Sequence, residues 1–297
     1  MPDAAFLESI AAARRLRVLF VGQCDSGKTT LVAQAARHAL RNASVSVVDA
    51  DVGQSHIGPP TTIAWAKADQ PFDSLSDLKM ESMYFVGSTS PQFHLLPTAL
   101  GTIKIVSRAA CAADKVLIDT PGFIRGEAAR QLLWHIVDSV QPEIVVAVQQ
   151  AGELQHILSP YARSSSPHVI EIPQSPDCVE KTREQRTEYR EALFRRYFAD
   201  SAELTLCWDD APVKSRGVID ECTALSTLHR LVSLRSSAGE DMALGIITGV
   251  DPANHRLVIR TPWAVASMPA SVVLGSLRLT PDGKEIPWPE GTSLPVP

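Results

Sequence analysis

Apolar positions along the first two thirds of the chain fall into two alternating patterns. Short runs of Val, Ile and Leu predict strands buried on both faces, and stretches with apolar residues three and four positions apart predict helices. The expected strands are Arg17–Val21, Ser44–Asp49, Met83–Gly87, Lys115–Asp119, Glu143–Val148 and His168–Ile172. The expected helices are Lys28–Leu40, Phe93–Ala112, Glu127–Val140 and Thr182–Phe198. This alternation predicts an α/β fold with a doubly wound, mostly parallel sheet.

The pattern changes near residue 215, where short strands separated by turns begin. The expected strands are Arg230–Arg235, Ala243–Val250, Arg256–Thr261 and Val272–Arg278, with turns at 236–239 and 251–254. Short strands at this spacing are typical of a small all-β module. The sequence therefore predicts one domain over residues 1–215 and a small, β-rich C-terminal domain over residues 216–297.

Composition and charge narrow the possible classes of protein. Apolar residues make up 45% of the chain and charged residues 21%, which are values of a folded protein. No run of 18 apolar residues occurs, so no membrane span and no membrane partner are expected. The net charge of −5 argues against a protein that coats nucleic acid, although not against an enzyme that holds a few nucleotides. Five scattered cysteines without a C-x-x-C pair predict neither a zinc site nor a disulfide framework, and they favour the cytoplasm.

A phosphate-binding motif lies between the first expected strand and the first expected helix. The segment Gly22-Gln-Cys-Asp-Ser-Gly-Lys-Thr29 fits G-x4-G-K-[ST], the P-loop of an NTPase. Its backbone N–H groups and the helix N-terminus are expected to surround phosphate oxygens, with Lys28 on the β- and γ-phosphates and Thr29 on Mg²⁺. The residues expected to bind the nucleotide are Gly22, Asp25, Ser26, Gly27, Lys28, Thr29 and Thr30. An ordinary glycine-rich turn is the alternative, and the flanking strand and helix disfavour it.

Three carboxylates follow the ends of predicted strands, where α/β sheets place their chemistry. Asp49 and Asp51 lie two positions apart and point to opposite faces, so one can face the γ-phosphate while the other is expected to cap a neighbouring loop. Asp119 ends an apolar strand, as in a Walker B motif that holds Mg²⁺. Asp119-Thr-Pro-Gly122 also matches the D-x-x-G switch of GTPases. The segment Ile144–Ala151 contains no N-K-x-D motif for guanine, which disfavours that class.

The last expected helix of the α/β region carries a row of arginines. Arg183, Arg186 and Arg190 fall on one helical face, next to a row of glutamates. One interpretation is a solvated helix with exposed ion pairs, which contribute little to stability. The other is an arginine lid over a phosphoryl group in transfer.

Taken together, these residues resemble the polynucleotide 5′-hydroxyl kinase family of RNA-processing P-loop proteins. The D-x-D-x-G-Q segment downstream of a P-loop is more specific than the P-loop alone. The matching segments are Gly22–Thr29, Asp49–Thr62, Phe85–Pro91, Asp119–Gly126, Val179–Phe198, Leu244–Gly249 and Leu274–Arg278. The resemblance covers most of the chain and implies a P-loop NTPase domain followed by the small β domain.

The resemblance also implies roles for individual residues. Asp51, in a D-x-x-Q unit with Gln54, is similar to the family's general base and is expected to help bind the metal, and Gln54 is expected to contact the substrate. Thr120 and Gly122 match a T-x-G-W clasp that holds the end of the polynucleotide, with Phe123 at the aromatic position.

The family's lid has two arginines five residues apart, and the corresponding residues are Lys181 and Arg186. A lysine cannot form the bidentate fork of an arginine. Arg183 and Arg190 are the next candidates on this helix.

The resemblance implies an ATP- and Mg²⁺-dependent kinase that phosphorylates the 5′-hydroxyl end of single-stranded RNA or DNA. Arg186 would stabilise the transferring phosphoryl group, and Asp51 would take or orient the proton of the hydroxyl. One alternative is an ATP-binding assembly subunit with little catalysis, whose C-terminal β domain docks a protein partner. A GTPase-like switch is the other alternative.

Overall fold

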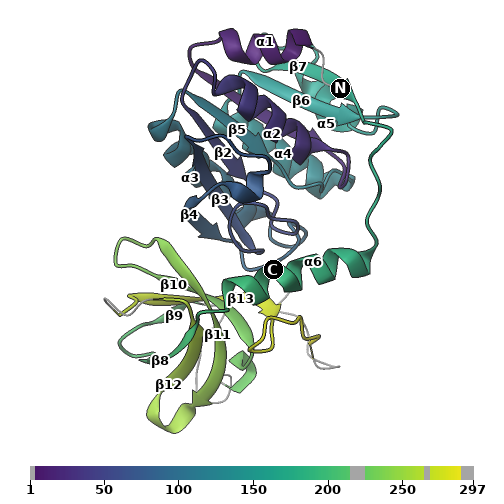
Figure 1. The fold of residues 1–297 in the computed structure, drawn as a ribbon. Coiled ribbons are helices and arrows are strands. Elements are labelled where there is room, and N and C mark those ends of the chain that lie inside the picture. The colour runs from purple at the N-terminus through teal and green to yellow at the C-terminus, as the bar shows by residue number, and fades with distance from the viewer. Residues whose placement is uncertain (1–3, 215–224, 264–267, 289–297) are drawn as a thin grey trace. The chain divides into compact units, whose positions relative to one another are not determined.

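The computed structural model describes residues 4–214, 225–263 and 268–288. These residues form two compact units, whose elements are labelled in Figure 1. The first unit comprises residues 1–58, 62–84 and 90–182, as far as they are described. The second unit comprises residues 59–61 and 85–89 together with the described residues from 183 onward.

The second unit begins well before the boundary expected from the sequence at 215/216, a position that lies outside the described residues. Helix α6 (Arg183–Tyr197) and strand β8 (Ala202–Cys207) account for the difference. The Tyr197 hydroxyl accepts a hydrogen bond from Leu244 N at 2.9 Å, and β8 pairs with a strand of the C-terminal region. Both elements therefore belong with the β strands that follow them.

The first unit is built on a seven-stranded sheet with the order β7-β6-β1-β5-β2-β3-β4. Its five strands from β7 to β2 are parallel, and β3 runs antiparallel to β2. The strands are β1 (Leu16–Gly22), β2 (Val45–Asp49), β3 (Thr62–Ala68), β4 (Met80–Phe85), β5 (Lys115–Asp119), β6 (Ile144–Gln149) and β7 (His168–Pro173). Because β1 has β5 on one side and β6 on the other, the strand order reverses at β1, where such sheets bind ligands.

Helices pack along this sheet in two groups (Figure 1). Helix α1 contacts α2, which lies on β1, β2 and β5, and helix α3 contacts α4 together with β2, β3 and β5. The helices of the unit are α1 (Ala4–Ala12), α2 (Lys28–Ala39), α3 (Leu95–Ala112), α4 (Gly126–Val140) and the short α5 (Gln155–Leu158). The α/β fold with a mostly parallel sheet is thereby confirmed.

All six strands and all four helices expected in this region are present, and β4 begins three residues before its predicted start. Strand β3 was not predicted. Its sequence, Thr-Ile-Ala-Trp-Ala-Lys-Ala, has no run of Val, Ile or Leu, yet six of its seven residues are buried. The residues of β3 are buried because the strand pairs with β2, and the local sequence of β3 does not encode that pairing.

Helix α3 is, among the described helices, the one whose length and mean hydropathy of 1.2 would suit a membrane span. Of that apolar stretch, 39% is buried inside the structure. Its buried side includes Gly101, Ile105 and Ala109, and it lies against the sheet and α4. Part of the apolar surface of α3 therefore packs into the core of the first unit.

The second unit is a β structure joined to α6, in the strand order β8-β12-β11-β10-β13-β9. All these pairs are antiparallel except β13 with β9. The strands besides β8 are β9 (Val213–Lys214), β10 (Arg230–Arg235), β11 (Asp241–Asp251), β12 (Arg256–Thr261) and β13 (Ser271–Arg278). The four strands expected here are present, whereas β8 and β9 were not predicted.

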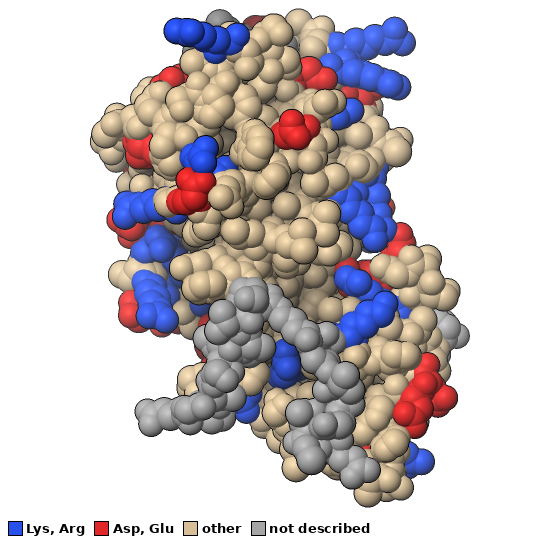
Figure 2. Space-filling model, turned by 180° about the vertical axis from the view of Figure 1, so that it is seen from behind, with Lys and Arg blue, Asp and Glu red and all other residues tan. Residues whose placement is uncertain are grey.

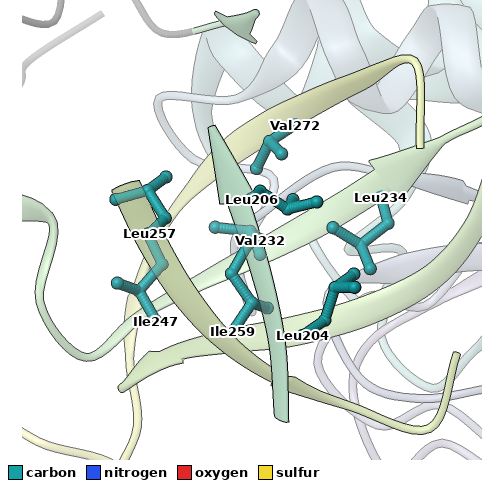
Figure 3. Close-up of a cluster of buried hydrophobic side chains, with 8 residues drawn as sticks. All are labelled: Leu204, Leu206, Val232, Leu234, Ile247, Leu257, Ile259 and Val272. Atoms are coloured by element: carbon teal, nitrogen blue, oxygen red, sulfur yellow. The ribbon is translucent and has the colours of Figure 1, made fainter. Parts of the chain in front are cut away.

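One apolar cluster forms the core of the second unit (Figure 3). Its members come from five of the six strands: Leu204, Leu206, Val232, Leu234, Ile247, Leu257, Ile259 and Val272. Strand β8 contributes through the alternate positions Leu204 and Leu206, whose neighbours face solvent. This alternation is the pattern of a strand with one buried face.

We expect Asp241→Ala to destabilise the second unit by about 3 kcal/mol or more, because it would leave a largely buried arginine without its partner. The Asp241 carboxylate pairs with Arg235 at 2.6 Å and accepts hydrogen bonds from Ser233 Oγ and Phe85 N. Urea unfolding followed by circular dichroism measures the loss. The control is Asp209→Ala, whose pair with His255 is exposed and is worth about 1 kcal/mol or less. An equal loss of unfolding free energy in Asp241→Ala and Asp209→Ala would contradict the stabilising role given to the buried Asp241–Arg235 pair.

Candidate active site

The P-loop joins the carboxyl end of β1 to the first turn of α2. Gly27 precedes α2 with a φ of +87°, and a Cβ there would lie 3.1 Å from Cys178 Sγ. Gly22 is packed against β6, because a Cβ would lie 2.6 Å from the Val148 carbonyl oxygen. The two glycines therefore let the loop curve tightly, which directs backbone N–H groups toward an anion.

A cavity of about 290 Å³, here called the phosphate cavity, lies over this loop. Residues 24–30 of the P-loop form one wall, and Asp51, Gln54 and His56 form another. The third wall comes from the segment that follows β7, through Asp177, Cys178, Val179 and Lys181. Every residue predicted to bind the nucleotide lines this cavity except Gly22, which has a packing role.

Lys28 is the buried cation of the phosphate cavity. Its side chain is 5% exposed, and Nζ donates a hydrogen bond to the Gln23 carbonyl oxygen at 2.9 Å. A lysine held at the start of a helix, with its ammonium folded back over the loop, is placed to contact phosphate oxygens. Contact of Lys28 with the β- and γ-phosphates stays a prediction.

The two carboxylates after β2 have different environments. Asp49 is 1% exposed and does not line the phosphate cavity; its oxygens accept hydrogen bonds from Asp51 N, His56 N and Ile57 N at 3.0, 2.5 and 2.9 Å. Burial, reinforced by the neighbouring Asp119, raises the pKa of Asp49 well above its usual range. Asp49 therefore holds the loop that follows β2.

Asp51 lines the phosphate cavity, unlike Asp49. Its Oδ1 accepts hydrogen bonds from Gly53 N at 2.9 Å and Gln54 N at 3.0 Å. Its Oδ2 makes no hydrogen bond to any described residue. One oxygen thus fixes the carboxylate and the other is available to a ligand.

Asp119 faces the P-loop from the end of β5. Its Oδ2 accepts a hydrogen bond from Thr29 Oγ1 at 2.6 Å, and its Oδ1 is buried without a partner among the described residues. Burial raises the pKa of Asp119 to about 6, against the opposing effects of Lys28 and of the Thr29 hydrogen bond. A buried carboxylate with one unpaired oxygen beside a hydroxyl is a suitable ligand pair for a hard cation.

The donor set fits Mg²⁺ bound together with phosphates. Among the described residues, no group of three or more His, Cys, Asp or Glu side chains forms a metal cage. Mg²⁺ characteristically takes one or two protein carboxylates and completes its shell with water and substrate phosphates. Thr29 and Asp51 line the phosphate cavity, and Asp119 contacts Thr29 from behind the P-loop, so these three residues provide oxygen ligands of this kind.

The residues predicted as a clasp have packing roles in the structure. Thr120 is buried, and its Oγ1 donates a hydrogen bond to the Phe20 carbonyl oxygen at 2.7 Å. Gly122 lies against the P-loop, where a Cβ would lie 2.4 Å from Cys24 N. Neither residue lines the phosphate cavity, so contact of these two with a polynucleotide stays a prediction.

Lys181 lies on the rim of the phosphate cavity, as the lid prediction requires. Its backbone N–H donates to Asp25 Oδ2 at 3.1 Å, and its Nζ donates to Gln54 Oε1 at 3.3 Å. Lys181 therefore links the segment after β7 to the P-loop and to the loop after β2. Two residues predicted to contact substrate, Lys181 and Gln54, are brought together.

The three arginines of the lid prediction lie on α6, in the second unit. Arg183 is exposed and Arg186 is half-buried. Arg190 pairs with Glu285 at 2.6 Å and donates a second hydrogen bond to Thr187. Arg190 is thus engaged within its own unit, and substrate contact by these arginines stays a prediction.

Two parts of the phosphate cavity were not predicted from the sequence: Asp177 and Cys178 in the segment after β7, and the ring of His56. Burial lowers the pKa of His56, and Lys181 adds to the effect while Asp51 opposes it, so the ring is neutral at pH 7. The rule that ligands bind beyond the carboxyl ends of parallel strands points to the segment after His168–Pro173. That loop reads Gln-Ser-Pro-Asp at 174–177, so it also lacks N-K-x-D.

Comparison with known proteins places this chain among CLP1-like sequences. A family model for the P-loop of the mRNA cleavage and polyadenylation factor CLP1 matches residues 22–200. A polyribonucleotide 5′-hydroxyl-kinase of Pyrococcus furiosus is 27% identical, over 92% of this chain and 90% of the relative. The corresponding enzyme of Thermococcus kodakarensis is 38% identical, over 66% of this chain and 55% of the relative. The polyribonucleotide 5′-hydroxyl-kinase of Pyrococcus abyssi is 34% identical, over 70% of this chain and 58% of the relative.

A solved structure supports the fold. A chain in the wild-type Clp1p–Pcf11p complex has a TM-score of 0.70 at 15% identity, over 92% of this chain and 77% of that chain. This likeness confirms the α/β P-loop fold followed by C-terminal strands, and at that identity it concerns the fold alone.

We expect Gly122→Ala to weaken nucleotide binding at least tenfold in the absence of any polynucleotide. The new methyl group would lie 2.3 Å from Cys24 Sγ and 2.4 Å from Cys24 N, so the P-loop backbone would have to move. Titration calorimetry with ATP and Mg²⁺ measures the change. An effect confined to the KM for a polynucleotide, with unchanged nucleotide affinity, would favour the clasp role over the packing role.

Proposed function

The chain belongs to the CLP1 P-loop family, and on that premise we propose that it is a polynucleotide 5′-hydroxyl-kinase using ATP and Mg²⁺. Its acceptor is the 5′-hydroxyl end of RNA or DNA. The observation that carries the proposal is the position of Asp51. A carboxylate with one available oxygen lines the same cavity as the buried P-loop lysine, Lys28.

Lys28 and the P-loop backbone bind the β- and γ-phosphates. Thr29 and Asp119, which already contact each other at 2.6 Å, hold Mg²⁺ with the help of Asp51. When bound, Mg²⁺ supplies positive charge to the β- and γ-phosphate oxygens. The residues of this chain thus orient the γ-phosphoryl group toward the side of the cavity that carries Asp51.

Asp51 accepts or orients the proton of the attacking 5′-hydroxyl. The N–H groups of Gly53 and Gln54 fix Oδ1, and Oδ2 makes no hydrogen bond to any described residue. Because a carboxylate fixed in this way needs little reorganisation, it favours the geometry of in-line attack. Asp49 takes no part in the proton transfer and acts by holding the loop.

The polynucleotide is held near its end as a single strand, and not along a basic groove. On the face drawn in Figure 2, blue and red side chains are interspersed among the described residues without one continuous basic track. The net charge of −5 agrees with this. Lys181 and Gln54 line the phosphate cavity and would contact the end of the strand. The Thr120–Gly122 turn would serve as the clasp and the arginines of α6 as the lid.

A second candidate function is an ATP-binding assembly subunit. The solved Clp1p chain that shares this fold is in complex with Pcf11p, which supports a protein partner for this family member as well. In this chain the second unit, with its β strands, would supply the docking surface. The enzyme and the subunit differ in one property, transfer of phosphate.

The deciding experiment measures transfer of radiolabel from γ-labelled ATP to oligonucleotides that carry a 5′-hydroxyl. RNA and DNA oligonucleotides of the same sequence are compared, with 5′-phosphorylated oligonucleotides as the control. Label on 5′-hydroxyl ends supports the kinase. Tight ATP binding with no transfer to either oligonucleotide would favour the assembly subunit.

We expect Asp51→Asn to lower kcat by about 10²-fold or more while ATP binding and the melting temperature change little, because the amide cannot accept the proton. Asp49→Asn is expected to do the reverse. Its amide nitrogen would face at least one of the backbone N–H groups that now donate to the carboxylate, so stability falls by about 1–3 kcal/mol. A crippled kcat in a fully stable Asp49→Asn protein, with near-normal Asp51→Asn turnover, would reverse the assignment.

For the lid, Arg186→Ala is expected to slow transfer by about 10³-fold, as for an arginine that stabilises a transferring phosphoryl group. Arg186→Lys restores little, because the planar fork is lost. Arg196→Ala, an exposed arginine on the same helix, is the control for loss of positive charge. Arg190 is unsuitable for that purpose because of its ion pair with Glu285. Equal turnover of Arg186→Ala and Arg196→Ala would leave α6 as a solvated helix.

A further inference from the structure

A second cavity, of about 500 Å³, lies on the other side of the P-loop turn. It is bounded by α2 and by the segment 172–178 after β7. Five residues line both this cavity and the phosphate cavity: Ser26, Gly27, Thr30, Asp177 and Cys178. The two spaces are therefore neighbours, and a ligand with its phosphates in one can extend into the other.

The lining of the second cavity combines apolar surface with a few polar groups. Leu31, Val148, Ile172 and two prolines supply the apolar part. Gln34, half-buried on α2 one turn beyond Thr30, supplies a side-chain amide. That amide makes no hydrogen bond to any residue in the described part of the chain. Gln174, in the segment after β7, lines the same cavity with a second amide. An apolar cavity with available amides suits a flat heterocycle that has a polar edge.

We propose that the second cavity binds the purine base of the nucleotide and that Gln34 reads the edge of that base. The inference rests on the proposed function, in which the triphosphate occupies the phosphate cavity. It adds that this chain takes purine nucleotides as a class, adenine and guanine alike, and discriminates against pyrimidines.

The chemistry of the amide gives this specificity. With adenine, Oε1 accepts from the N6 amino group while Nε2 donates to N7. With guanine, Nε2 donates to O6 while Oε1 accepts from N1–H. Rotation about the last side-chain bond presents the amide in either order, so one residue serves both purines. A pyrimidine is smaller by one ring and leaves the amide without its full set of bonds.

The test is a binding titration of ATP, GTP, CTP and UTP, with Mg²⁺ and without polynucleotide. Inorganic tripolyphosphate probes the phosphate cavity alone. The variants are Gln34→Leu, which removes the amide, and Gln34→Glu, which leaves acceptors only. Gln131→Leu, an exposed glutamine on α4, is the matched control. Melting temperatures of all variants verify that each one is folded.

For the natural chain, we expect ATP and GTP to bind within about tenfold of each other and CTP and UTP to bind at least tenfold more weakly. Gln34→Leu should weaken both purine nucleotides by about tenfold and leave tripolyphosphate unchanged. Gln34→Glu should weaken ATP more than GTP, because a carboxylate accepts from guanine N1–H and N2–H but cannot donate to adenine N7.

Two results would overturn the inference and leave the kinase proposal intact. One is equal affinity for purine and pyrimidine nucleotides. The other is ATP and GTP affinities in Gln34→Leu that match those of the natural chain and of Gln131→Leu. Failure of every nucleotide and of tripolyphosphate to bind would overturn the proposed function together with the inference.

Discussion

The hydrogen bonds from the loop after β2 to the buried carboxylate of Asp49 are the interaction on which the active site depends. Three backbone N–H groups, those of Asp51, His56 and Ile57, converge on its two oxygens. Burying a carboxylate is costly, and burial raises the pKa of Asp49 accordingly. The backbone donors offset that cost and fold the loop back on the end of β2. As a result, Asp51 lines the phosphate cavity with one oxygen fixed and the other available.

Charge is distributed so that the phosphate cavity combines one buried cation with several acid groups. Lys28 and Asp119 are both nearly inaccessible, and Asp49 and Asp119 are register partners on adjacent parallel strands. Burial raises both pKa values, and repulsion adds to it, from Asp119 on Asp49 and from Asp51 on Asp119. A divalent cation between Thr29, Asp119 and the phosphates would relieve that repulsion, which is the electrostatic reason for pairing this site with Mg²⁺. The same arrangement suits the neutralisation of a triphosphate.

The sequence predicted those parts of the fold whose signals are local. The P-loop, the strands of the parallel core and α4 each follow from a motif or a periodic run of apolar residues. Strands β3, β8 and β9 were missed because their burial comes from neighbours distant in the sequence; β8, for example, has only Leu204 and Leu206 facing the core. The sequence did predict that Asp49 and Asp51 have different roles, because side chains two positions apart at this strand end were expected to point to opposite faces. Which carboxylate faces the cavity came from the resemblance and from the structure, since the hydrogen bonds to His56 and Ile57 are invisible in the sequence.

Binding of ATP to the natural chain and to Lys28→Ala, measured by titration calorimetry in the presence of Mg²⁺, tests the account most directly. Lys28 is the buried cation of the phosphate cavity, at 5% exposure, and its ammonium folds over the P-loop. We expect the natural chain to bind ATP and Lys28→Ala to lose tight binding while remaining folded. Unchanged ATP affinity in a folded Lys28→Ala protein would contradict the assignment of this cavity to the triphosphate, and with it the proposed chemistry.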